Sequence, residues 1–224
     1  MWKEMYNIMS LLNDFMSGFL DNLAGHLALT AFMLAVTDER AVWRRLKKLP
    51  LLLLAPLVAA LLSVLLYAVP ELGMLQYLIY SFAVLIMYTV WVRWAWQFGF
   101  WRAFAATCMA RIFQVAVTTL SGILFWIILP DEDFRFIAAI GLHLSISITA
   151  ALLLHKLRFG KCFRLLLDDE TAIWRTALLL FALETTMEMF YYLLNGIQSQ
   201  YLLLYYLLLL VMVVLMAVLV AVLV

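Results

Sequence analysis

Six polar residues stand inside long apolar stretches of this sequence, and their side-chain types could do chemistry there. They are Asp21, His26, Arg111, Gln114, Glu184 and Glu188. An ionisable side chain in an apolar environment needs an oppositely charged partner, a hydrogen-bond partner or a water-filled cavity. The six residues therefore form either a ligand-binding or signal-coupling site, or a set of polar contacts that only joins helices.

The spacing of these residues predicts an ion pair. Arg111 lies about nine residues into the apolar stretch 103–129, which is roughly 13 Å at the rise of an α-helix. Glu184 lies about ten residues into the stretch 173–194, so the two side chains reach a similar depth if both stretches start at one membrane face. Glu188 follows Glu184 by one helical turn, and Gln114 follows Arg111 in the same way. We predict an Arg111–Glu184 pair near the middle of the membrane.

Motifs for the common kinds of catalysis are absent from the sequence. Residues 201–224 contain no lysine that could form a retinal Schiff base, and the chain has no G-x-S-x-G, H-E-x-x-H or P-loop motif. We therefore predict no catalytic residue, no cofactor and no metal site. One enzyme alternative stays open, because His155 and Cys162 are spaced like the His–Cys pair of membrane peptidases that process signalling peptides. The glycine-rich, arginine-containing segment that precedes the histidine in those enzymes is missing.

The composition places these residues in a membrane protein. Of the 224 residues, 68% are hydrophobic and 13% are charged, whereas soluble domains have about half apolar and a quarter charged residues. A net charge of +1 gives no indication of nucleic-acid binding. The lipid bilayer is the expected environment, in a single transmembrane domain that covers residues 1–224.

Apolar stretches long enough to cross a bilayer, roughly 20 residues each, divide the chain into seven expected helices. Their ranges are 8–36, 51–69, 75–97, 103–129, 136–155, 173–194 and 201–224. The first contains Asp14, Asp21 and His26, so it either turns this polar face towards the other helices or lies along the membrane surface. The expected fold is an all-α polytopic helix bundle with about seven helices, or six if the first is interfacial.

The distribution of basic residues predicts the orientation of the bundle. Arginines and lysines are concentrated in 40–48, beside 98–101 and in 156–164, while 70–74 and 195–200 have none and 130–135 is mainly acidic. Basic loops stay in the cytoplasm, so the N-terminus is expected outside and the C-terminus inside. Tryptophans cluster near the third loop, at Trp91, Trp94, Trp96 and Trp101. This pattern is typical of an interfacial aromatic belt, although a ligand cage is the alternative.

Three stretches of helix and loop resemble a known family. They are Phe100–Ala106 running into Cys108–Ala116, His155–Gly160 leading to Phe163–Glu170, and Leu178–Glu188 followed by Asn195–Gln198. The arrangement resembles the membrane sensor region of bacterial GHKL-type histidine kinases, the class that includes the accessory-gene-regulator peptide receptor. The sequence contains no phosphoacceptor-histidine segment and no ATP-binding domain, so the chain as given has no kinase activity.

The resemblance implies a function. A multi-pass protein of the bacterial cytoplasmic membrane would detect an extracellular small molecule or peptide, as in quorum sensing, and signal through its last helix to the kinase of a two-component system. It also implies a homodimer. The alternative is a substrate-binding subunit of a vitamin-type transporter, since those are small hydrophobic chains of similar size. A purely structural membrane protein is the third possibility.

Overall fold

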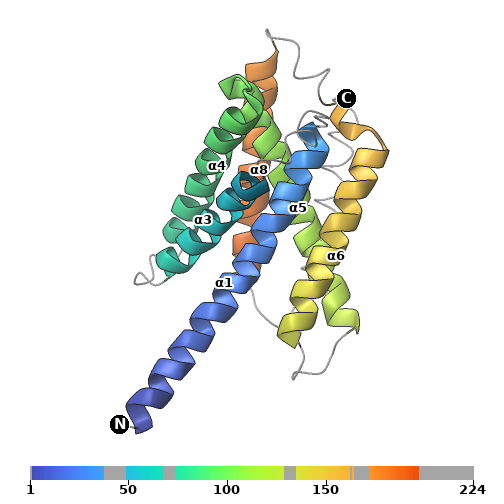
Figure 1. The fold of residues 1–224 in the computed structure, drawn as a ribbon. Coiled ribbons are helices and arrows are strands. Elements are labelled where there is room, and N and C mark those ends of the chain that lie inside the picture. The colour runs from blue at the N-terminus through green and yellow to red at the C-terminus, as the bar shows by residue number, and fades with distance from the viewer. Residues whose placement is uncertain are drawn as a thin grey trace.

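A computed structural model describes residues 2–37, 49–67, 74–128, 135–161, 163 and 172–196. This part of the chain is almost entirely α-helical and contains no strand. Its six long helices are α1 (Trp2–Thr37), α3 (Leu49–Tyr67), α4 (Met74–Trp96), α5 (Phe100–Ile128), α6 (Arg135–Lys156) and α8 (Ile173–Gly196) (Figure 1). The expected all-α helix bundle is confirmed, while the predicted span 201–224 lies outside the described residues.

Four helical segments of this part of the chain are long and apolar enough to cross a membrane. They are Phe15–Thr37, Leu75–Trp96, Phe100–Ser121 and Ala138–Lys156. The protein is therefore an integral membrane protein. From α3 onwards, each described helix begins and ends within three residues of its predicted bounds. Apolar stretches gave reliable helix ends here because charged residues and prolines separate them. The end of α4 has a local cause as well, since Gln97 takes the left-handed backbone conformation, φ 57°, that terminates helices.

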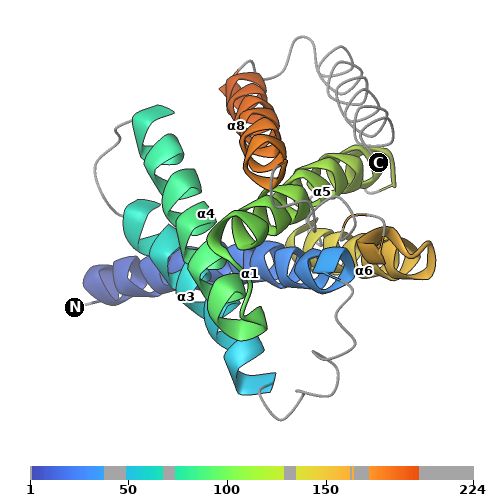
Figure 2. The ribbon, with the colours of Figure 1, turned by 90° about the horizontal axis from the view of Figure 1, so that it is seen from above.

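Helix α5 is the centre of the bundle. It packs against α1, α4, α6 and α8, while α1 also contacts α3 and α6 (Figure 2). The fully buried residues of α5 include Ala103, Ala105, Ala106 and Ala110. Small side chains allow helix backbones to approach closely, which favours helix association inside a membrane.

Helix α1 belongs to the bundle interior along its second half. Leu29, Phe32 and Met33 are almost completely buried, and the Phe32 ring stacks on Phe113 of α5 with 6.0 Å between centroids. The interfacial alternative for the first helix is therefore wrong. Of its polar residues, His26 is buried among the other helices, as the bundle-interior expectation requires, whereas Asp21 is exposed. In an amphipathic helix that lies on the membrane surface, Leu29, Phe32 and Met33 would remain partly open to lipid.

The tryptophan cluster is divided between the core and the surface. Trp94 and Trp101 are 57% and 40% exposed, as an interfacial belt requires. Trp91 and Trp96 are buried and pack edge to face, with 5.1 Å between ring centroids. The belt interpretation is wrong for these two residues. Both belong to the core cluster in which α4 packs against the other helices, so their burial stabilises the bundle.

Consecutive helices run in alternate directions (Figure 1), which allows a direct test of the predicted orientation. Cysteine is introduced at Gly99, where a new side chain has open space, or at Arg135, the first residue of α6. The background carries Cys108→Ala and Cys162→Ser. In whole cells, an impermeant maleimide is expected to label the cysteine at 135 and to leave that at 99 unlabelled. The reverse pattern would contradict an outside N-terminus.

Candidate functional site

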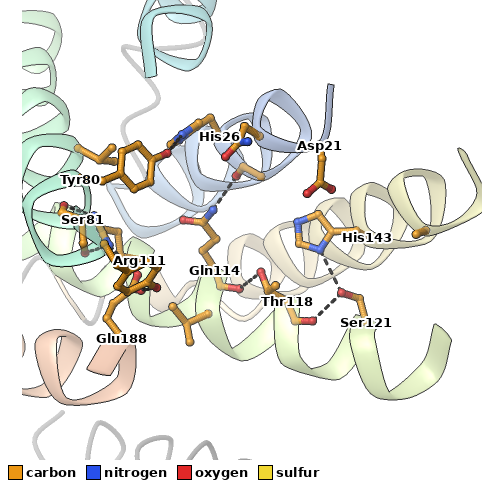
Figure 3. Close-up of a pocket in the computed structure, with 16 residues that line it drawn as sticks. Asp21, His26, Tyr80, Ser81, Arg111, Gln114, Thr118, Ser121, His143 and Glu188 are labelled. Carbon is orange, nitrogen blue, oxygen red and sulfur yellow. Dashed lines mark hydrogen bonds and ion pairs between the residues drawn. The ribbon is translucent and has the colours of Figure 1, made fainter. Parts of the chain in front are cut away.

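A cavity of about 430 Å³ lies between the helices, with lining residues from α1, α4, α5, α6 and α8 (Figure 3). A volume in this range is typical of small-molecule sites in proteins. Most of its lining residues have polar or charged side chains. The polar and charged lining residues are Asp21, Asn22, His26, Tyr77, Tyr80, Ser81, Arg111, Gln114, Thr118, Ser121, His143 and Glu188.

Arg111 forms the centre of a buried ion-pair network, and the predicted Arg111–Glu184 pair is confirmed. Its Nε lies 2.6 Å from Oε1 of Glu184, a close charge contact without hydrogen-bond geometry. Its Nη2 donates to Oε1 of Glu188 at 2.6 Å. Both carboxylates stand on α8, one helical turn apart, so a single guanidinium holds two acidic groups of the same helix face.

The same guanidinium also binds α4. Nη1 donates to the backbone oxygen of Ser81 at 2.8 Å, and Nη2 donates to the Ser81 hydroxyl oxygen at 2.6 Å. The hydroxyl of Tyr77, one turn before Ser81, donates to Oε2 of Glu188. Arg111 of α5 therefore connects α4 with α8 through charge-assisted hydrogen bonds, which are stronger than those between neutral groups.

Helix α1 closes the cavity on the opposite side. Nε2 of His26 lies 2.8 Å from the hydroxyl of Tyr80 on α4, and the imidazole stacks on Tyr88 at 5.9 Å between centroids. The side-chain nitrogen of Gln114 donates to the backbone oxygen of Gly25 at 2.8 Å. A Cβ at position 25 would lie 3.4 Å from that nitrogen, so the Gln114 side chain packs directly against the α1 backbone.

Towards its other end the cavity carries a second group of polar side chains. Nδ1 of His143 on α6 lies 3.1 Å from the hydroxyl of Ser121 on α5. The Asp21 carboxylate of α1 points towards the His143 ring (Figure 3). Ser121 also donates to the backbone oxygen of Thr118 at 2.8 Å. Ser121 therefore contacts both its own helix and His143 of α6, and this contact links α5 to α6.

Five of the six residues singled out from the sequence line this cavity, and Glu184 contacts Arg111 beside it. Sequence reasoning missed the tyrosines and Ser81 of α4, because such residues are common in transmembrane helices. It also missed His143. A signal for this residue existed, since His143 is the one ionisable residue between Arg135 and His155.

The His155–Cys162 pair cannot be placed as a pair. His155 is exposed at the end of α6, and Cys162 lies outside the described residues. The other cysteine, Cys108, is fully buried in α5. Within the part of the chain that the structure describes, no three His, Cys, Asp or Glu side chains come together in a way that could hold a metal ion.

Comparisons of the chain with protein-family models, with curated proteins and with solved structures found no match. A function for this protein therefore has to be inferred from the arrangement of the cavity and its charges.

Proposed function

We propose that the protein is the membrane-embedded receptor of a bacterial two-component signalling system, in which a ligand in the cavity changes the position of α8. The observation that carries this proposal is the Arg111 network. Its guanidinium forms part of the cavity wall and also holds Glu184 and Glu188 of α8. A ligand in the cavity would therefore meet the group that fixes α8.

The attachment of α8 supports a signalling role for it. This helix packs mainly against α5 and only lightly against α4, so the bonds from Arg111 and Tyr77 form much of its link to α4. A ligand shifts an equilibrium between two helix arrangements only if it binds one of them better. A ligand that competes for the side chains of this network has such a preference.

Phosphate transfer in native membranes tests the proposal. The complete gene product, as its native reading frame encodes it, is isolated with its copurifying partners and supplied with labelled ATP. Phosphorylation of a histidine in the complex is expected to depend on the extracellular ligand fraction, and Glu188→Gln is expected to abolish that dependence. Thr186→Ala on the exposed face of α8 is the matched control and is expected to behave like the unmodified protein.

The outcome that contradicts the proposal points to the transporter alternative. In that outcome, the protein copurifies with an ATP-hydrolysing transport partner and no histidine is phosphorylated. The ligand also accumulates in sealed vesicles that contain the complex. Because the same cavity could present a substrate to such a partner, the phosphorylation readout and not ligand binding alone separates the two functions.

A further inference from the structure

The cavity carries more negative than positive charge in the part of the chain that the structure describes. Asp21 and Glu188 line it, Glu184 lies against Arg111, and Arg111 is the one lysine or arginine among the described lining residues. With neutral histidines, three carboxylates stand against one guanidinium. Glu184 and Glu188 share Arg111, so the exposed Asp21 is the carboxylate left without a cation. A cationic ligand would restore the balance.

Most of the contacts of the Arg111 guanidinium are already made within the protein. Its Nε contacts Glu184, its Nη2 contacts Glu188 and the Ser81 hydroxyl, and its Nη1 donates to the Ser81 backbone oxygen. A carboxylate or phosphate that approaches this guanidinium would meet the like charges of Glu184 and Glu188. Such juxtaposed like charges disfavour binding.

A buried imidazole supplies a second and independent indication of a ligand. His26 lines the cavity and is 6% exposed, yet its Nδ1 has no hydrogen-bond partner among the described residues. In the tautomer whose Nε2–H donates to Tyr80, Nδ1 is an acceptor. Buried polar atoms without a partner are rare and costly, and an N–H donor of a bound ligand would satisfy this one.

The remaining lining residues also suit a cation. The carboxylate of Asp21 forms no hydrogen bond or ion pair within the described residues, and it points towards the His143 ring (Figure 3). The rings of Tyr77 and Tyr80 form part of the wall, and aromatic faces attract ammonium groups. Arg111 is the one arginine or lysine in the lining that the structure describes, and its guanidinium is held by Glu184, Glu188 and Ser81.

We propose that the cavity binds a small organic cation that carries a protonated primary amine. The ammonium group donates hydrogen bonds to the Asp21 carboxylate and to Nδ1 of His26, and it lies in the field of Glu188. This inference rests on the proposed function only in taking the cavity as the receptor's ligand site. The ammonium can belong to a free amine or to the N-terminus of a peptide, and probes of each kind separate these sources.

Calorimetric titration of the purified protein in lipid nanodiscs tests the charge preference. The free-amine series is benzylammonium, benzyl alcohol and benzoate, which share a ring and differ in charge. The peptide series is glycyl-phenylalanine amide with and without an N-acetyl group. We expect saturable binding of at least one ammonium probe, and no saturable binding of its neutral or anionic counterpart. Which series binds identifies the source of the ammonium.

Substitutions test whether Asp21 and His26 bind the ammonium group. Asp21→Asn is expected to weaken ammonium binding about tenfold or more, which corresponds to about 1.4 kcal/mol, and Asp21→Glu is expected to restore most of it. His26→Phe is expected to weaken it as well, while Ser145→Ala on the exposed face of α6 is the control without effect. Thermal unfolding of each variant in the same nanodiscs identifies any that fails to fold.

The results that overturn this inference differ from those that overturn the receptor function. Binding of benzoate as tight as that of benzylammonium, absence of saturable binding by every ammonium probe, or full binding by a folded Asp21→Asn variant rejects the cation site. An ammonium ligand that binds through Asp21 but leaves phosphorylation unchanged supports the cation site and rejects the receptor function.

Discussion

Replacement of Arg111 by glutamine is expected to destabilise the bundle by about 3–5 kcal/mol, because it leaves two carboxylates without their cation. Arg111 is 4% exposed and Glu184 is 3% exposed, so water cannot compensate for the lost charge. The free energy of unfolding is measured by reversible denaturation with dodecyl sulfate in mixed micelles. A loss below about 1 kcal/mol, typical of ordinary polar contacts between transmembrane helices, would show that the network is dispensable.

A matched control exists for this variant. Arg93 also belongs to a described helix but is exposed near the end of α4. Arg93→Gln is expected to change the free energy of unfolding by less than about 0.5 kcal/mol, as most surface substitutions do. The difference between the two Arg→Gln variants isolates the effect of burial and pairing from the effect of losing an arginine.

The double variant Glu184→Gln/Glu188→Gln is expected to be about as unstable as Arg111→Gln, by about 3–5 kcal/mol, since it leaves the guanidinium as an unpaired buried cation. Each single variant is expected to cost about 1 kcal/mol or less. One carboxylate is sufficient to neutralise Arg111, so a single variant loses contacts of one side chain but leaves no unpaired buried charge. The cost is therefore expected to be strongly non-additive.

The same denaturation experiment, performed on the two single variants and the double variant, measures this coupling. Additive costs would show that Glu184 and Glu188 act independently and that Arg111 does not need to be neutralised. A single variant as unstable as the double variant would show that Arg111 needs both carboxylates. That result would contradict the excess of negative charge from which the cation site is inferred.

The sequence was sufficient to predict the helices and the depth of their charges. Apolar stretches with clear boundaries predicted each described helix from α3 onwards, and similar depths predicted that Arg111 and Glu184 meet. Depth along a helix follows from residue number alone. A buried charge also has few partners to choose from, which makes such pairs predictable inside a membrane.

The rotation and neighbours of each helix could not be predicted in the same way. Tyr77 and Ser81 have side chains that are common throughout membrane proteins, so nothing in the sequence indicated that they face Arg111. Trp91 and Trp94 are the same residue type, three positions apart in one apolar stretch, yet the first is buried and the second is exposed. Which face of a helix is buried depends on its packing partners, and transmembrane helices that are apolar on all sides give no signal for it.

The link between α4 and α8 is the central claim, and a distance measurement between these helices tests it most directly. Spin labels at Ile79 of α4 and Ala182 of α8, both exposed, report this distance in nanodiscs, in the Cys108→Ala and Cys162→Ser background. Glu188→Gln removes a carboxylate that binds both Arg111 and Tyr77 and is expected to shift or broaden the distance distribution. Glu184→Gln, which leaves those contacts intact, is expected to preserve it. Identical distributions in both variants and in the unmodified protein would contradict the claim that this network holds α8 in place.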